Sequence, residues 1–260
     1  MPMKYRYKRY NNHREKNWIV FLLIGILIGS MATYYYFTTY YYKPVQTSTQ
    51  TYTPVTEPFS SHVEISLVAV DQDGNGVTTP LIVESKPGNG KILTNIEKLL
   101  FWTDTQQSIQ IAKYVAENLT EINASRYDLT YSIESDATVI GGPSAGAALT
   151  IATIAALRNE KIRNDVVITG TINGDGTIGE IGGILEKAKA AKDVGAKLFL
   201  VPEGQGEQTL LRPEESCSKR GNIIYCRTTY KAVTINIGQE AGISVLEVGS
   251  IGDAYKFFKL

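Results

Sequence analysis

The sequence from residue 141 to residue 157 reads Gly-Gly-Pro-Ser-Ala-Gly-Ala-Ala-Leu-Thr-Ile-Ala-Thr-Ile-Ala-Ala-Leu, and the other segments can be interpreted around it. From Ala147 onward this run holds no charged residue, which predicts a helix buried on nearly all sides. Upstream, Tyr127 to Glu134 alternates apolar and polar residues, which predicts a half-buried strand. Ser144 is therefore expected in a glycine-rich turn between a strand and the N-terminus of a buried helix.

A serine at this place has two interpretations. The first turn of a helix presents unpaired backbone N–H groups, and the helix dipole adds to their attraction for an anion. A serine hydroxyl beside them would have an oxyanion hole ready, with Gly142, Ala145 and Gly146 as the oxyanion and turn backbone. In the alternative, the glycines and Pro143 only form a tight turn and Ser144 only caps the helix.

The amino-acid composition excludes some classes of catalytic site and partner. The 260 residues are 43% hydrophobic, which is normal for a globular protein, and 26 basic residues balance 26 acidic ones. This balance gives no basic field for a nucleic acid partner. His13 and His62, the two histidines, lie outside the expected folded core. A Ser-His-Asp triad and a histidine-ligated metal site are therefore not expected, and we expect neither a metal nor a cofactor.

The N-terminal segments predict a membrane anchor. Residues 1–17 are rich in lysine and arginine, and residues 18–37 carry no charge. About 20 apolar residues span a bilayer, and Trp18 with Tyr34–Tyr36 is typical of the interfacial aromatic belts. The positive-inside rule predicts a single-pass protein with a cytoplasmic basic tail (1–17), a transmembrane anchor (18–37) and the remainder outside the cytoplasm. A cleaved signal peptide is the alternative.

Beyond the anchor, residues 38–62 are rich in Tyr, Thr, Ser and Pro and predict a solvated stalk, so the folded domain is assigned to residues 63–260. Strands are expected at 63–70, 79–85, 165–170 (a central strand), 197–202 and 243–248, and helices at 103–119 and 184–193. For the first helix, the core candidates are Ile109, Ala112, Tyr114, Val115 and Leu119. Alternating strands and helices predict an α/β (α+β) domain with a mixed sheet and packed helices.

Several local patterns have weaker interpretations. The turn 71–76 lacks the glutamate of a calcium loop, so a hairpin turn is expected, and Gly88 to Lys91 lacks the spacing of a phosphate loop. Asn118 and Asn123 begin glycosylation sequons. Residues 203–230 predict a loop-rich stretch that contains Cys217 and Cys226. Because these cysteines are expected outside the cytoplasm, they are predicted to form a disulfide.

A second candidate site residue lies on the helix 184–193. Lys187 follows Gly182-Gly183 by one turn and has Ala188, Ala190 and Ala191 as neighbours. A lysine is usually a solvated surface residue, and Lys189 and Lys192 are expected to be so. A lysine among small apolar residues can instead be desolvated, which lowers its pKa and lets the neutral amine accept a serine proton.

Taken together, the two motifs resemble the proteolytic domain of the Lon protease family. The family's serine motif is similar to Gly142 to Gly146, and its lysine segment is similar to Gly182-Gly-Ile-Leu-Glu-Lys187. Residues 165–170 resemble the strand whose threonine supports the lysine, which assigns that role to Thr169. The segments 90–94 and 107–110 are similar to upstream parts of the family, and the resemblance covers roughly residues 63–250.

The resemblance also has departures. Gly141 stands where many Lon proteases have an aspartate, and Thr171 stands where many have a glutamate. The ATPase module of ATP-dependent members has no counterpart motif here. Residues 170–179 look more like the membrane-anchored, ATPase-free relatives of archaea and bacteria.

The resemblance implies a membrane-anchored, ATP-independent serine endopeptidase (a hydrolase) with a Ser144–Lys187 dyad. Its expected substrates are unfolded or flexible proteins and peptides. Two alternatives stay open at this point. One is a small-molecule kinase-like domain in which residues 141–148 hold a phosphate. The other is an inactive relative that serves as a binding or scaffold domain. The sequence gives no oligomeric state.

Overall fold

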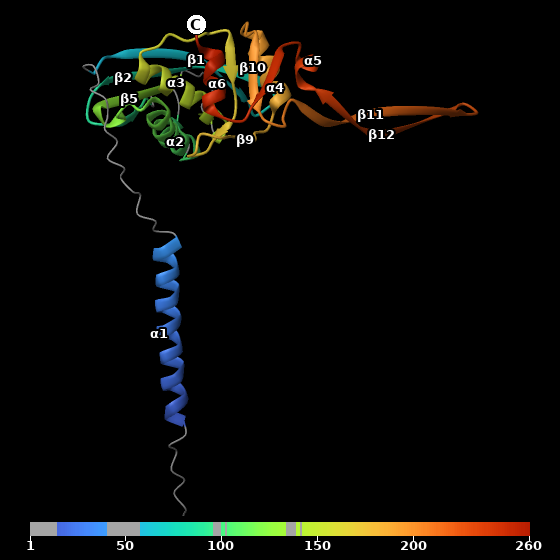
Figure 1. Ribbon diagram of the computed structural model, residues 1–260. Helices are drawn as coiled ribbons and strands as arrows, with labels where there is room; N and C mark the ends of the chain where they lie inside the picture. The colour runs from blue at the N-terminus through green and yellow to red at the C-terminus, as the bar shows by residue number, and fades with distance from the viewer. Residues whose placement is uncertain (1–14, 41–57, 96–99, 102, 134–138, 141) are drawn as a thin grey trace, which may run out of the picture. The chain divides into compact units, whose positions relative to one another are not determined.

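The computed structural model describes residues 15–40, 58–95, 100–101, 103–133, 139–140 and 142–260 (Figure 1). The chain divides into two units, Met1–Thr51 and Tyr52–Leu260. Much of the predicted basic tail (1–17) and of the predicted stalk (38–62) lies outside the described residues, as does Gly141.

The first unit contains one helix, α1 (Glu15–Tyr40), among its described residues. This helix includes the whole segment 18–37, and most of its described side chains are exposed apolar or aromatic groups such as Phe21 and Met31. Within the described part of the chain, no helix meets the length and hydropathy expected of a bilayer span. The helix is confirmed, and its role as an anchor stays a prediction.

The second unit contains all the other elements. Its helices and helical turns are α2 (Thr103–Thr120), η1 (Ala124–Arg126), η2 (Pro143–Ala145), α3 (Gly146–Arg158), α4 (Ile184–Asp193), α5 (Ile237–Ala241) and α6 (Ile251–Phe258). Its strands are β1 (Ser61–Val70), β2 (Gly76–Pro87), β3 (Ile92–Thr94), β4 (Leu100–Phe101), β5 (Tyr127–Ile133), β6 (Val139–Ile140), β7 (Val166–Ile168), β8 (Thr171–Ile172), β9 (Ile178–Gly179), β10 (Leu198–Pro202), β11 (Glu207–Arg220), β12 (Ile223–Asn236) and β13 (Ser244–Val248).

Two sheets organise this unit. The larger has the order β1-β2-β5-β3, antiparallel except for the parallel pair β3 and β5. The smaller has the order β13-β10-β7 and is parallel throughout. The mixed α/β class is thus confirmed, with two main sheets and three two-stranded ones among the described residues where the sequence suggested one sheet.

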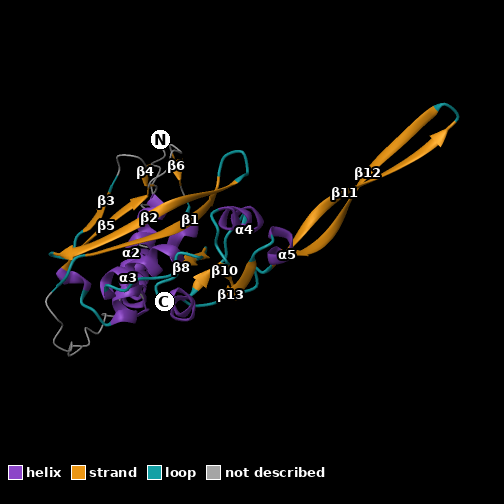
Figure 2. Cartoon of the chain, turned by 90° about the horizontal axis from the view of Figure 1, so that it is seen from above, coloured by secondary structure: helices purple, strands orange, loops and turns teal. Residues whose placement is uncertain are grey.

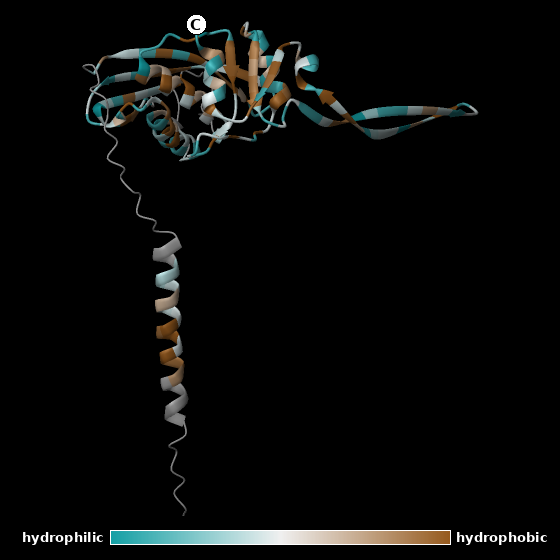
Figure 3. Cartoon of the chain, viewed as in Figure 1, coloured by the Kyte–Doolittle hydropathy of each residue, from teal (hydrophilic) through white to brown (hydrophobic). Residues whose placement is uncertain are grey.

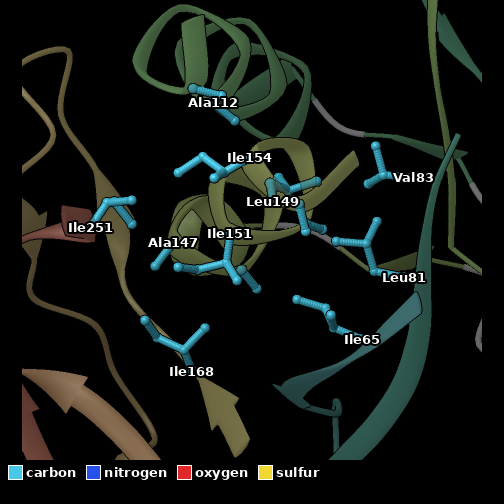
Figure 4. Packing of buried hydrophobic residues seen from close by; sticks show 14 of the residues in the cluster. Ile65, Leu81, Val83, Ala112, Ala147, Leu149, Ile151, Ile154, Ile168 and Ile251 are labelled. Carbon is cyan, nitrogen blue, oxygen red and sulfur yellow. The ribbon is translucent and has the colours of Figure 1, made fainter. Parts of the chain in front are cut away.

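Helix α3 lies at the centre of the main core. Every residue from Gly146 to Leu157 is buried, as the absence of charge predicted. Figure 4 shows its side chains between Ile65, Leu81 and Val83 of the first sheet, Ala112 of α2, Ile168 of β7 and Ile251 of α6. Strand β5 alternates buried and half-buried residues, which confirms the half-buried strand. The core therefore fixes the helix that follows Ser144 on all sides.

The parallel sheet separates two cores. Val166, Ile168 and Leu200 face the cluster around α3. Val167 and Phe199 face a second cluster with the apolar side chains of α4. Strand β7 was predicted as central, and this is wrong because it lies at the end of the sheet order. Both of its faces are covered, so its three residues have the continuous apolar pattern of a central strand.

Two other predictions concern surface positions. The turn after β1 is a hairpin turn as expected, in which the Asp71 carboxylate accepts the N–H groups of Asp73 and Asn75. These hydrogen bonds hold the pKa of Asp71 below its usual value. In α2 the core candidates Ile109, Ala112 and Val115 are buried. Tyr114 and Leu119 are exposed, so their assignment to the core was wrong.

The stretch 203–230 is not loop-rich, because most of it belongs to a long hairpin. Strands β11 and β12 pair from Glu207 with Asn236 to Arg220 with Ile223, and Gly221-Asn222 forms the turn (Figure 2). Figure 3 shows this hairpin mainly in hydrophilic colours and the parallel sheet in hydrophobic ones. Cys217 and Cys226 lie directly opposite each other and form the predicted disulfide.

The disulfide should order the hairpin without stabilising the core. We expect the double variant Cys217→Ser/Cys226→Ser to keep the wild-type unfolding midpoint, because the hairpin end packs on no core. The hairpin itself loses about 2–3 kcal/mol of loop-entropy stabilisation. Limited proteolysis should therefore cut the variant first between β11 and β12. Thiols that alkylate at both positions in the unreduced wild-type protein would contradict the disulfide.

Candidate active site

Ser144 lies in the turn η2, between Gly142 and the first residue of α3. Gly142 has a backbone φ of 111°, a region that favours glycine. Gly146 permits a close approach of the helix to β8, because a Cβ atom there would lie 2.5 Å from the Ile172 Cγ2 atom. These two glycines explain why the motif needs residues without side chains on both sides of Ser144. The serine itself is partly exposed.

The backbone of Ser144 is tied to the segment that follows β7. The Ser144 carbonyl accepts hydrogen bonds from the Gly170 N–H, at 3.0 Å, and from the Thr169 hydroxyl, at 3.3 Å. In return, the Ala147 N–H donates to the Gly170 carbonyl. The Thr169 residue is only 1% exposed. The structure therefore brings Ser144 and Thr169 together, which the motif order along the sequence suggested.

Gly170 is a site residue that the sequence analysis missed. Its position after the apolar run Val166-Val-Ile168 and Thr169 marks the end of a buried strand, which could have indicated a backbone contact.

A hydrogen bond inside the turn at Ser144 involves one of the backbone N–H groups expected in the oxyanion hole. The Gly146 N–H donates to the Pro143 carbonyl, so it supports the turn. The oxyanion roles of Gly142 and Ala145 stay predictions.

Lys187 is placed by the start of α4. Gly183 has a left-handed conformation there, and the Lys187 N–H donates to the Gly183 carbonyl at 3.0 Å. Only 4% of Lys187 is exposed, whereas Lys189 and Lys192 are exposed as predicted. In the described part of the chain, the Lys187 side chain forms no hydrogen bond or ion pair that would offset its burial. Desolvation therefore lowers the pKa of Lys187 to about 8.

The two halves of the predicted dyad belong to segments on the two faces of the parallel sheet. Thr169 directly follows β7 and bonds to Ser144, while α4 belongs to the apolar cluster that includes Val167 of β7 and Phe199 of β10. No hydrogen bond joins Ser144 to Lys187, or Thr169 to Lys187, within the described residues. The dyad and the support of the lysine by Thr169 accordingly stay predictions.

The other candidate binding segments do not form a second phosphate or metal site within the described residues. The N–H groups of Asn89 and Lys91 donate to the Asp128 carboxylate, so the loop that resembled a phosphate site is already engaged. Among the described residues, one group could hold a metal by distance, Glu215 with Cys217 and Cys226, but its two sulfurs are joined as a disulfide.

The two sequons differ in their surroundings. Asn118 lies exposed in the last turns of α2. Asn123 caps η1, and its side-chain oxygen accepts both the N–H and the hydroxyl of Ser125. A glycan would be attached to the amide nitrogen and not to this oxygen, but Asn123 is half-buried and Asn118 is exposed, so Asn118 is the more accessible of the two. Modification at both positions stays a prediction.

The burial of Lys187 should be visible in the stability of the protein. Below pH 8 the native lysine is protonated while buried, so wild-type stability carries the full desolvation cost. As pH rises from about 8 to about 10.5, the native state binds fewer protons than the unfolded state and the cost is lost. We expect Lys187→Met to raise the free energy of unfolding at pH 7 by about 3 kcal/mol.

This gain should disappear near the upper end of that range. Chemical denaturation of both proteins at neutral and at alkaline pH measures it, and Lys189→Met is the exposed control. A gain of the same size at both pH values would mean that better packing, and not the charge of the lysine, explains it.

Known proteins are similar to this chain over the segment that contains the candidate site residues. The family model of the Lon protease (S16) C-terminal proteolytic domain matches residues 83–233, which include Ser144, Thr169 and Lys187. The chain is 33% identical over 133 residues to the Lon protease of Phenylobacterium zucineum, covering 50% of this chain and 17% of that protein. The Lon protease of Vibrio parahaemolyticus is 36% identical over 126 residues (46% and 16%). The archaeal Lon protease of Thermococcus kodakarensis is 31% identical over 114 residues (41% and 18%).

The matched segments thus span less than a fifth of each of these three relatives. The family model nevertheless covers more than half of this chain and includes both motifs. The chain belongs to the family of Lon protease (S16) C-terminal proteolytic domains.

Proposed function

We propose that this chain is a serine endopeptidase in which Ser144 is the nucleophile and Lys187 is the general base. The observation that carries the proposal is the burial of Lys187, whose pKa falls to about 8 inside a domain of a peptidase family. An amine with this pKa is substantially neutral at slightly alkaline pH and can then accept a proton. The bonds that hold the Ser144 carbonyl support the same assignment, because they fix the backbone of the nucleophile.

In the proposed reaction, Lys187 Nζ takes the proton of Ser144 Oγ as the oxygen attacks the peptide carbonyl. The tetrahedral oxyanion is stabilised by backbone N–H groups of the turn around Ser144 and Ala145. Lys187 then gives its proton to the leaving amine, which releases the first product and leaves an acyl ester on Ser144. A water molecule deprotonated by Lys187 hydrolyses this ester and restores the serine. Thr169 acts as a positioning residue between the two motifs.

The proposal also covers the location of the enzyme, its independence of ATP and its substrates. We infer that the protease domain lies on the extracytoplasmic side of a membrane, anchored by residues 18–37, and works without ATP on unfolded or flexible substrates. The charge-free segment after a basic tail supports the anchor. The Cys217–Cys226 disulfide supports an oxidising compartment.

Removal of either dyad member should abolish peptide hydrolysis. We expect Ser144→Ala and Lys187→Ala each to lower kcat by at least about a thousandfold, because the members of such a pair act as one unit. Lys187→Arg should be equally inactive, since a guanidinium stays protonated. Wild-type kcat should rise as pH increases through about 8, where the lysine becomes neutral. A fluorogenic peptide assay with circular dichroism of each variant measures this.

The same assay separates the proposal from other chemistries. Activity should persist in EDTA and without nucleotide. Near wild-type turnover by Lys187→Arg would remove Lys187 as the base, and a requirement for ATP would contradict the proposed ATP independence.

The anchor can be tested independently of catalysis. We expect the full-length chain to stay in the membrane pellet after an alkaline carbonate wash, because a spanning helix is held by its apolar surface. Deletion of residues 18–37 should release the protein into the supernatant, whereas deletion of residues 2–14 should not. Full-length protein in the supernatant would count against the anchor.

A further inference from the structure

The hairpin β11–β12, called the ribbon below, extends beyond the packed layers (Figure 2). Its strands of 14 residues each pair with no other strand in the part of the chain that the structure describes. At about 3.3 Å per residue the ribbon is roughly 45 Å long. An isolated two-stranded hairpin is marginally stable, and both of its edges offer unpaired backbone groups. The disulfide compensates for the missing core at the outer end.

Exposed apolar side chains lie on both faces of the ribbon, Ile223 and Tyr225 on one of them. Directly paired residues share a face, so the apolar Leu211, Tyr230 and Ile224 lie on the other, together with Glu215, Lys219 and the disulfide. Leu211, Tyr230 and Ile224 are 67%, 69% and 63% exposed. An apolar row on a solvated ribbon indicates an interaction surface.

The charges of the ribbon indicate the sign of its partner. From the Arg212–Lys231 pair to the tip, residues 212–231 contain five basic residues and two acidic ones, Glu214 and Glu215, so this part has a net positive charge. Lys219, Arg227 and Lys231 form no ion pair within the described residues. In contrast, Arg212 near the base is paired with Glu240 at 3.0 Å. The outer part of the ribbon is thus complementary to an acidic partner.

The outer edges of β11 and β12 differ in the backbone N–H groups that they offer. Pro213 in β11 has no N–H, and proline in a strand places its nitrogen on the outer side. A chain added to this edge would lack a donor there. Strand β12 contains no proline, so it offers the uninterrupted edge. The partner best suited to such an edge is an extended polypeptide that adds as a third strand.

The base of the ribbon adjoins the segment that leads to Lys187. The Gln205 side chain accepts from the Ile181 N–H and donates to the Ile181 carbonyl, at 3.0 and 2.9 Å. A cavity of about 120 Å³ lies beside it, lined by residues 181–184 of the start of α4 and by Gln205, Glu207 and Gln208. The Gln208 Oε1 atom is buried and has no hydrogen-bond partner among the described residues, so this wall has an unused acceptor.

We propose that the ribbon is a substrate-capture arm, which binds an extended acidic polypeptide along β12 and leads it to the cavity at the start of the Lys187 helix. This inference rests on the proposed function, because it supplies the substrate class of the same site. It also fits the proposed ATP-independent action on flexible chains.

Binding to the full-length Ser144→Ala protein in detergent tests the arm without catalysis. The probe is a long, fluorescein-labelled, unstructured peptide rich in Asp, Glu and Leu, measured by fluorescence anisotropy. We expect Leu211→Thr/Ile224→Thr/Tyr230→Thr to weaken binding about tenfold or more. Tyr114→Gln removes another exposed aromatic residue, on α2, and should leave the affinity unchanged.

Separate variants test the basic residues of the ribbon and the free edge of β12. Lys219→Glu/Arg227→Glu/Lys231→Glu should weaken binding of the acidic peptide about tenfold and lower its salt dependence, whereas Lys161→Glu should not. Tyr230 is the partner of Pro213, so its N–H points away from β11, and the N–H of Thr228, two residues along β12, points to the same free β12 edge. Thr228→Pro should therefore weaken binding while the disulfide and the circular dichroism spectrum stay intact.

Activity of the enzyme with Ser144 present gives the second readout. The ribbon variants should raise KM for the long peptide about tenfold with kcat unchanged, and should leave a short fluorogenic peptide unaffected. Unchanged affinity and KM in all three variants would overturn the capture arm. If the variants instead lose binding to anionic vesicles or lose a dimer, with peptide affinity unchanged, the ribbon serves a lipid surface or a second copy and the proposal is wrong. Binding without cleavage of either peptide would contradict the proposed function and leave the arm supported.

Discussion

The burial of helix α3 is the constraint on which the candidate site depends. A helix with twelve consecutive buried residues cannot slide or rotate without exposing apolar surface or colliding with a neighbouring layer. Its two threonines fit this environment because their hydroxyls donate to helix carbonyls, Thr150 to Gly146 and Thr153 to Leu149. Ser144 precedes this fixed helix by two residues. Its carbonyl is held by Gly170 and Thr169, so the turn has little freedom to move.

A second constraint acts from the other face of the parallel sheet, where α4 buries a charged side chain at a free-energy cost. Ile184, Lys187, Ala188 and Ala191 follow the spacing of one helix face, so the lysine shares the side whose apolar cluster includes residues of β7 and β10. Burial without an opposite charge favours the neutral amine. The fold therefore tolerates a destabilising feature at the point where an amine base would be useful, as functional sites often do.

The sequence predicted buried elements well and exposed ones poorly, for a physical reason. Helix α3 and strand β5 have one-sided or all-round burial, which leaves a periodic pattern. The ribbon buries neither face over most of its length, so its sequence has no periodic pattern of burial. Only the turn residues Gly221-Asn222 and the β-branched and tyrosine-containing run after them could have indicated a hairpin. Lys187 differs from Lys189 and Lys192 only by helical phase. Gly170 contributes through its backbone, which no side-chain pattern reveals.

The same contrast separates the energetics of the core from those of the ribbon. Residues around α3 and α4 are coupled through shared packing, so a change at one position is felt at the next. The outer ribbon contacts neither cluster, and its order depends on its own ladder and on the cross-link between Cys217 and Cys226. Its surface can therefore vary without disturbing the turn at Ser144 or the environment of Lys187. A fold divided in this way can change what it binds while the geometry of its buried site stays the same.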